Sequence, residues 1–365
     1  MNPLSSVFAN LYLGCGLIAA VAVVMRVTER VSSGQRLLST ALVVPFVIVY
    51  LVGMHRIAGT DYENYLAAYT DQGQPIPDLG YTALTGLMRE VGVDFSTFLL
   101  LQGIFTLAAL WVVSKSKGAD PVVVLVVYLL HLAIVRDLSQ SRIGLAVAIY
   151  LLGQTQRRGL PKILLYVFAL SIHITVVVLM LIWAYANLTS RLKPSRQVIV
   201  LYLPLLVFAA YGAGLLDIAS AVEPRVAIYL SWDEEAYGAP LASFGALWRT
   251  IPIVGVFCLA AARFKEARLR EYIVMELAGV AILFGFAQFS IFSARLSNVA
   301  ISMYPIGLGI VAHAYRSRSV IPRTTPYSLG IKLTVGATLA VLLARPGSFD
   351  ALLEVVPSAF EWLSG

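Results

Sequence analysis

Eleven long apolar runs divide this 365-residue chain, and they constrain its fold more than any other feature. A helix that crosses a membrane needs about 20 apolar residues. The runs lie at 7–25, 37–55, 95–113, 119–136, 140–155, 160–186, 197–216, 245–262, 272–294, 297–315 and 327–344. Charged residues make up only 13% of the chain, about half of the share with which a soluble protein covers its surface. The sequence therefore predicts an all-α, polytopic integral membrane protein.

The polar segments between the runs are too short to fold alone. We therefore expect a single transmembrane domain over 1–345, with outer loops at 56–94 and 217–244 and a short periplasmic interfacial tail over 346–365. The sequence contains no phosphate-binding glycine loop, no HExxH and no Cys/His metal spacing. No metal site and no cofactor are expected.

Basic residues set the expected orientation, because Lys and Arg are retained on the cytoplasmic side of a membrane. The linker after the first run holds three arginines, which places the N-terminus outside and 56–94 in the periplasm. Alternation of sides then agrees with the charges as far as 160–186. If that run crossed the membrane, eleven basic residues downstream would lie outside against four inside.

We therefore predict about ten spanning helices plus a re-entrant helical hairpin near 160–186, with its turn near Ser171–His173 and both termini periplasmic. This assignment places 19 basic and 5 acidic residues inside, against 8 basic and 15 acidic residues outside. Each arm of about 12 residues reaches about 18 Å, past the middle of the membrane core. Backbone that turns at this depth has to be buried in protein or line a wet cavity. The second choice makes 197–216, interrupted by Pro204, the re-entrant segment.

Three arginines are predicted at the outer ends of apolar runs, at positions 136, 142 and 295. Arg136 and Arg142 have two interpretations, an ion pair with Asp137 or a phosphate contact, and Arg295 is either an interfacial anchor or a ligand. The arginine fork stays charged and matches phosphate oxygens. Three arginines at one membrane face, without a rich set of acidic partners, favour a receptor for a dianionic head group.

Two further polar residues are candidates for acid–base chemistry. His173 lies at the predicted hairpin turn, where it is either a buried structural residue or a base that takes a proton from a hydroxyl group. Asp61 is either a helix N-cap or a base.

Aromatic residues gather on the outer loops. Tyr62, Tyr65 and Tyr69 have the spacing of one helix face. Such rings suit sugar stacking, and they equally suit the belt at a membrane surface. Tyr81 and Trp232 complete the predicted outer aromatic surface.

The order of these residues resembles that of a known family. It runs Asp61-Tyr62, Tyr65, Tyr69, Gly80-Tyr81, Arg142-x-x-x-Ala146, Ile172-His173-x-Thr175 and Arg295. In this order, and over about 50–300, the chain resembles the EpsG-type, Wzy-like polysaccharide polymerases of bacteria. The family often has an acidic residue and a proline directly before the Gly-aromatic pair. Here Leu79 separates Asp78 from Gly80, which weakens the case for a role of Asp78.

The resemblance implies a GT-C-like glycosyltransferase of the bacterial inner membrane. Such enzymes join oligosaccharide repeat units of O-antigen or exopolysaccharide, carried on undecaprenyl diphosphate, at the periplasmic face. On this hypothesis the diphosphate is held by arginines, and a base removes the proton from the acceptor sugar. We expect the diphosphate at Arg142, Arg295 and Arg136, the base at His173 or Asp61, and the saccharides at Tyr62, Tyr65, Tyr69, Tyr81 and Trp232.

The partners implied are the lipid-linked oligosaccharide and membrane lipid, with a chain-length regulator and a flippase as further candidates and no nucleic acid. One alternative function is a flippase or transporter for the same lipid-linked saccharide. Transporters usually have internal repeats and charges reachable from both sides, and we find neither in the sequence. The other alternative is an O-antigen ligase-type transferase, which shares the chemistry and differs only in its acceptor.

Overall fold

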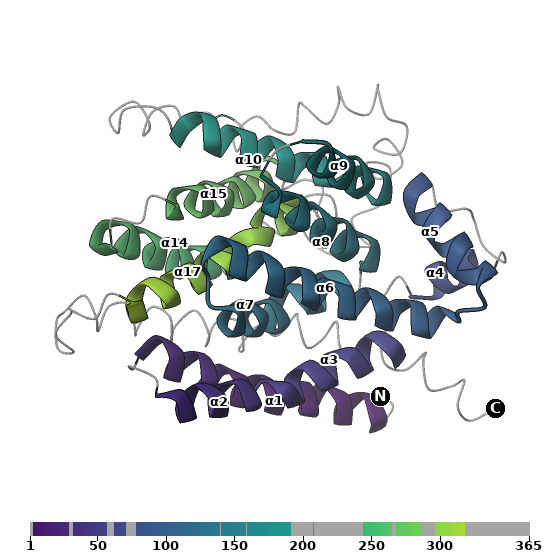
Figure 1. The fold of residues 1–365 in the computed structure, drawn as a ribbon, viewed down its shortest axis with the longest axis horizontal. Helices are drawn as coiled ribbons and strands as arrows, with labels where there is room; N and C mark the ends of the chain where they lie inside the picture. Colours follow the sequence, from purple (N-terminus) through teal and green to yellow (C-terminus); the bar gives the residue numbers. More distant parts are fainter. Residues whose placement is uncertain are drawn as a thin grey trace. The chain divides into compact units, whose positions relative to one another are not determined.

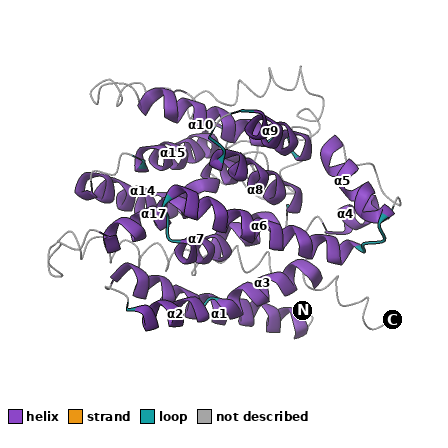
Figure 2. Ribbon diagram, viewed as in Figure 1, coloured by secondary structure: helices purple, strands orange, loops and turns teal. Residues whose placement is uncertain are grey.

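Helices make up every regular element in the part of the chain that the structure describes (Figure 2). This computed structural model describes residues 3–28, 32–56, 62–70, 78–138, 140–157, 159–190, 207, 244–264, 268–286 and 296–317. The all-α class is thereby confirmed. The chain divides into two compact units, Met1–Val176 with Leu308–Gly365, and Val177–Gly307.

Most helices of the first unit (Figure 1) lie in the predicted apolar runs, except α4 and α5, which lie in the predicted outer loop 56–94, while α2 and α3 divide the run 37–55 between them. They are α1 (Pro3–Thr28), α2 (Ser33–Ala41), α3 (Val44–Arg56), α4 (Tyr62–Tyr69), α5 (Leu79–Glu90), α6 (Phe95–Lys117), α7 (Pro121–Val127), η1 (Tyr128–Asp137), α8 (Ser141–Thr155) and α9 (Leu160–Ile172). Helix α17 (Tyr304–Ser317) enters this unit at Leu308. The predicted segments 197–216 and 327–344, the predicted loop 217–244 and the tail 346–365 lie outside the described residues, except for Val207 and Phe244.

Three described helical stretches are long and apolar enough to cross a membrane by themselves. They are Ser33–His55, Phe95–Lys117 and Leu296–Tyr315. Shorter apolar helices lie in other predicted spans, such as Asn10–Arg26 and Pro121–Ile134. These helices support a membrane protein, while the number of spans, the single transmembrane domain and the orientation stay predictions.

Local sequence signals explain where α6 and α7 start and stop. The Asp94 carboxylate accepts a hydrogen bond of 2.9 Å from the backbone N–H of Thr97, which caps α6. Gly118 ends that helix in the left-handed conformation, at φ 67°, which glycine adopts without steric cost. Asp120 then caps α7 through the Val122 N–H at 3.0 Å. Its neighbour, Pro121, occupies the first helical position, where a proline loses no hydrogen bond.

Helix α8 forms the centre of the first unit. Nearly all of its residues are buried, and it packs on α6 and α9. A helix that is apolar around its whole circumference belongs in an interior. The polar residues at its first turn, Ser141 and Arg142, therefore belong to a helix that packs on neighbouring helices on several sides.

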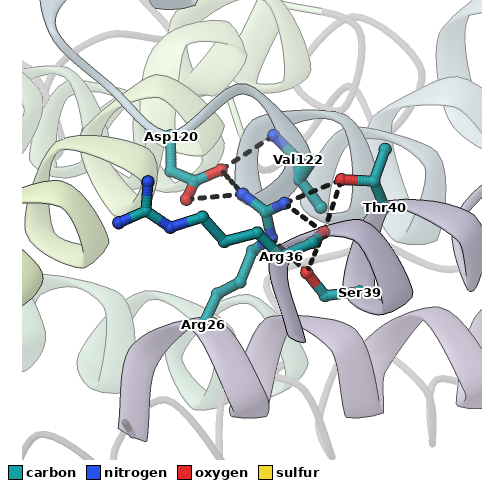
Figure 3. Close-up of polar contacts among 6 residues, drawn as sticks. All are labelled: Arg26, Arg36, Ser39, Thr40, Asp120 and Val122. Carbon is teal, nitrogen blue, oxygen red and sulfur yellow. Dashed lines mark hydrogen bonds and ion pairs between the residues drawn. The ribbon is translucent and has the colours of Figure 1, made fainter. Parts of the chain in front are cut away.

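One buried arginine joins α1, α2 and α7 (Figure 3). The Nη1 atom of Arg26 donates to both carboxylate oxygens of Asp120 at 3.0 Å. Its Nε donates to Ser39 at 2.8 Å, and its Nη2 donates to Thr40 at 2.8 Å and to the Arg36 carbonyl at 3.2 Å. The planar fork of arginine is matched to several acceptors at once. This cluster therefore fixes the end of the unit where α1, α2 and α7 meet.

A backbone contact relates α17 to the same end. The Asp120 N–H donates to the Gly309 carbonyl at 2.9 Å, and a Cβ at Gly309 would lie 2.5 Å from Val124. Our orientation places Asp120 on the cytoplasmic side, so the C-terminal half of α17 runs to that side as well. Both re-entrant assignments require this direction, whereas full crossings at both 160–186 and 197–216 would reverse it. The hairpin itself stays a prediction.

The helix break expected near Ser171–His173 is present. Helix α9 ends at Ile172, His173 adopts an extended conformation (φ −160°, ψ 123°), and α10 (Val176–Ser190) follows. Whether the chain turns back at this break, as a re-entrant hairpin requires, stays a prediction.

The second unit contains α10, α14 (Phe244–Phe264), α15 (Leu269–Gly285), η2 (Ile301–Met303) and the beginning of α17. Phe257 of α14 and Tyr272 of α15 lie with their rings 6.1 Å apart. A Cβ at Gly307 would lie 2.6 Å from the Phe257 ring, so glycine permits α17 to approach closely. Glu276 of α15 is completely buried in this unit.

Candidate functional site

Arg142 forms the centre of the candidate site, at the first turn of α8. Its Nη1 donates to the carboxylate of Asp78, which directly precedes α5. The guanidinium carbon lies 5.0 Å from the centre of the Tyr65 ring and 5.9 Å from the centre of the Tyr81 ring. Cations are attracted to aromatic faces at this range. The side chains of Arg142 and Asp78 are only 18% and 8% exposed, so their interaction is little screened by water.

The partner of Arg142 differs from the one expected. We considered an ion pair with Asp137, and the structure pairs Arg142 with Asp78 instead. The extra residue, Leu79, does not remove Asp78 from the site, because the Leu79 side chain points outward and is 83% exposed. The signal that could have identified Asp78 is its position just before a helix whose first turn carries Gly80 and Tyr81.

The Asp78 side chain contacts Arg142 and does not cap its helix. It occupies the N-cap position of α5, yet its side chain makes no capping hydrogen bond. The aspartates at the corresponding positions of α6 and α7, Asp94 and Asp120, both cap their helices. Such a cap is worth about 1 kcal/mol. A residue that forgoes this stabilisation to face a buried arginine is typical of a functional site.

Further buried polar groups lie next to this pair. The Tyr81 hydroxyl lies within reach of the side chains of Gln102 and Ser141. All three residues are at least 95% buried. The side-chain oxygen of Ser141 and both polar atoms of the Gln102 amide lack a well-aligned hydrogen bond among the described residues, and so does the Arg142 Nε. Buried polar groups are normally satisfied, so this group of polar atoms marks a buried polar region beside the pair of Arg142 and Asp78. Sequence analysis did not single out Gln102 or Ser141.

A close contact brings the end of α9 to the same site. A Cβ at Gly80 would lie 2.1 Å from the Ser171 hydroxyl oxygen and 2.8 Å from the Ser171 carbonyl carbon. No side chain fits at that separation, so only glycine allows α5 to pack here. His173 follows Ser171 by two residues, so the fold brings the Gly80-Tyr81 and His173 motifs to one region.

The hydrogen bonds of His173 restrict its chemistry. Its Nδ1 accepts from the backbone N–H of Thr175 at 3.2 Å and lies 2.9 Å from the Thr175 hydroxyl oxygen. A backbone N–H can only donate, so Nδ1 is unprotonated and the neutral ring carries its proton on Nε2. In this tautomer the other ring nitrogen is a hydrogen-bond donor.

The tyrosines of α4 share one face, as predicted, and that face turns inward. Tyr65 and Tyr69 are buried, and the Tyr69 hydroxyl donates to the Val93 carbonyl at 2.7 Å. Tyr62 lies 5.3 Å from the Phe95 ring. Tyr65 contacts Arg142 directly, whereas Tyr62 and Tyr69 pack on the beginning of α6. Their proposed saccharide contacts stay predictions.

Arg136 lies in the interior of the first unit. It is completely buried. The next residue, Asp137, accepts hydrogen bonds from Tyr50 at 2.6 Å and from Tyr128 at 2.8 Å. A Cβ at Gly144 would lie 2.0 Å from Asp137, so the first turn of α8 is packed directly on this carboxylate.

Three predicted site residues, Asp61, Arg295 and Trp232, lie outside the described residues. The described ranges contain no group of three His, Cys, Asp or Glu side chains that could hold a metal ion.

Comparison with known proteins connects this site to a family. Neither the comparison with curated proteins nor the comparison with solved structures gives a match. The model of the EpsG family matches residues 39–326, which include every predicted site residue. This chain therefore belongs to the EpsG family, which links it to exopolysaccharide biosynthesis.

Proposed function

We propose that this protein is an inner-membrane glycosyltransferase that polymerises undecaprenyl-diphosphate-linked oligosaccharide repeat units at the periplasmic face. Membership of the EpsG family supports the pathway. The observation that carries the reaction is Arg142, which lies against the neighbouring rings of Tyr65 and Tyr81 in a buried polar region and pairs with the Asp78 carboxylate.

Arg142 stabilises the diphosphate as it becomes the leaving group. Negative charge grows on the diphosphate oxygen while the sugar–oxygen bond breaks, and a preorganised cation at that point lowers the barrier. The rings of Tyr65 and Tyr81 hold the guanidinium in place, so little reorganisation is needed. Arg295 is retained as a second diphosphate ligand. Arg136 acts from the interior, as a fixed positive charge behind the first turn of α8.

Tyr81, Gln102 and Ser141 bind the saccharide next to the diphosphate. Their buried hydroxyl and amide groups belong to the polar region beside Arg142 and Asp78, and sugar hydroxyls are matched donors and acceptors. His173 donates through Nε2 to an oxygen of the donor or the acceptor.

The test compares Arg142→Ala and Arg142→Lys with Arg36→Ala, which removes an exposed arginine of α2. Each variant is expressed in a deletion strain, and surface polysaccharide is separated on a gel. Losing one preorganised donor to a developing anion costs about 10²–10³ in rate. We expect single repeat units in place of long polymer for Arg142→Ala, weak rescue by lysine, and normal ladders for Arg36→Ala.

Other outcomes separate the alternatives. Complete absence of surface glycan in the deletion strain would indicate a flippase. Normal lipid-linked polymer that is never transferred would indicate a ligase. Full-length ladders from Arg142→Ala, with the protein present in the membrane, would remove the diphosphate assignment.

A further inference from the structure

We propose that Asp78 is the catalytic base of this reaction, and that the donor diphosphate releases it from Arg142. This inference rests on the proposed function and assigns to Asp78 the proton transfer that the sequence assigned to His173 or Asp61.

The side chain of Asp78 is committed to the site and not to its helix. Two other aspartates of the first unit, Asp94 and Asp120, occupy the same helix position and cap, whereas Asp78 does not. Its carboxylate is 92% buried and lies against the guanidinium that receives the diphosphate. The carboxylate therefore lies next to the proposed diphosphate site and does not cap α5.

His173 is less suited to this role. Its Nδ1 lone pair already accepts the Thr175 N–H, and its Nε2 carries the remaining proton of the neutral ring. To accept a proton the ring would first have to break its contact with Thr175. The carboxylate of Asp78 can accept a proton directly once Arg142 is engaged elsewhere.

When the donor diphosphate replaces Asp78 as the anion bound to Arg142, the basicity of Asp78 changes. The diphosphate diester carries two negative charges and fits the arginine fork at two oxygens, so it competes well with a single carboxylate. Tyr65 and Tyr81 hold the guanidinium while its anion is exchanged. A carboxylate paired with arginine is a weak base. Once released from Arg142 and beside a dianion, Asp78 becomes more basic because the new neighbour disfavours its charge.

The proposed transfer forms one bond and breaks one bond at the anomeric carbon of the donor. The acceptor hydroxyl gives its proton to the Asp78 carboxylate, and its oxygen forms a bond to the anomeric carbon of the donor. The bond from that carbon to the diphosphate oxygen breaks. Its electron pair leaves with the diphosphate, whose charge Arg142 stabilises.

The experiment uses the full-length protein in detergent and measures binding of undecaprenyl diphosphate, with undecaprenol as the uncharged control. It compares Asp78→Asn, Asp78→Glu and Arg142→Ala with Glu90→Gln, which removes an exposed carboxylate at the other end of α5. Polymer formation is measured on the same variants. Thermal unfolding shows whether each variant is folded, and Asp78→Glu keeps the charge if the asparagine variant is poorly produced.

Loss of a base lowers the rate by about 10²–10⁴, so Asp78→Asn should form almost no polymer. It should nevertheless bind undecaprenyl diphosphate several-fold more tightly than the wild type, because no carboxylate competes for Arg142. Asp78→Glu should retain part of the activity, and Glu90→Gln should match the wild type in both assays.

Two results would overturn the role of Asp78. One is normal polymer from Asp78→Asn. The other is a loss of diphosphate affinity in Asp78→Asn as large as that in Arg142→Ala, since Asp78 would then only hold the arginine in place. Failure of the proposed function looks different: diphosphate binding would not depend on Arg142 in any background.

Discussion

Replacing Arg26 by alanine should destabilise the protein far more than replacing its neighbour Arg36. Arg26 donates to five acceptors on α2 and at the start of α7. Only the backbone carbonyl of Arg36 takes part in this cluster, and its side chain is exposed. Arg36→Ala therefore removes the same kind of side chain from the same end of the unit and leaves the cluster intact.

The magnitude follows from burial. The Asp120 side chain is completely buried and that of Arg26 is 9% exposed, so Arg26→Ala leaves a carboxylate without its counter-ion and out of reach of water. Breaking a buried ion pair in this way costs about 3–5 kcal/mol. Asp120 still caps α7 in this variant, so no capping energy is lost. Asp120→Ala adds the loss of that cap, about 1 kcal/mol, while Arg26 keeps its bonds to α2.

The assay is reversible unfolding of the purified protein in mixed detergent micelles, followed by far-ultraviolet circular dichroism. We expect Arg26→Lys to recover only part of the loss, since an ammonium group cannot reproduce the planar fork. Arg36→Ala should stay within about 0.5 kcal/mol of the wild type. If Arg26→Ala unfolded at the same detergent composition as Arg36→Ala, the reasoning from the buried ion pair would be refuted.

Three further predictions concern other contacts. Gly80→Ala should abolish polymer formation, because the new methyl group would collide with Ser171. Adding Ser171→Gly to this variant should restore part of the polymer, since it removes the hydroxyl but leaves the nearby backbone in place. Normal polymer from Gly80→Ala would contradict this packing. Gly144→Ala should lower the unfolding free energy by about 1–3 kcal/mol by overpacking against Asp137, measured as above. Hydrogen bonds from the Thr97 hydroxyl and from the Thr97 backbone N–H lower the pKa of Asp94 from its ordinary value of 3.8. Its stabilising effect should therefore be present above pH 3.8 and disappear as the pH falls through the lowered pKa; Asp94→Asn, compared at neutral and acidic pH, should remove this dependence.

The helical fold was predictable because apolar runs long enough for membrane spans leave little choice of secondary structure. The break before α10 was predictable too, since charge bias favoured a hairpin over 160–186 with its turn near Ser171–His173, ahead of 197–216. The site was predictable in part. Arg142, Tyr65 and Tyr81 were named from the sequence and do lie together, although their roles remain proposals.

What could not be predicted depends on tertiary contacts. In the sequence, Leu79 separates Asp78 from the Gly80-Tyr81 pair by one residue more than the family pattern. In the structure the Leu79 side chain is exposed, and Asp78 pairs with Arg142. Gln102 looks like a polar residue on an apolar helix, yet it lies beside the Tyr81 hydroxyl. Arg136 and Arg142 look equivalent in the sequence, whereas the structure buries the first completely. Spacing along a chain does not determine which side of a helix meets which neighbour.

The number of residues in η1 determines whether the side chains at its two ends, Tyr128 and Asp137, lie on the same face. Tyr128 and Asp137 are nine positions apart, and in an α-helix of 3.6 residues per turn they would lie on opposite faces. The wider turns of the π-helix η1, with about 4.4 residues each, return them to one face, where the tyrosine hydroxyl meets the carboxylate. Apolar exchanges within 128–137 should therefore be tolerated, whereas a single insertion or deletion there would turn Asp137 away from its tyrosines and displace the start of α8.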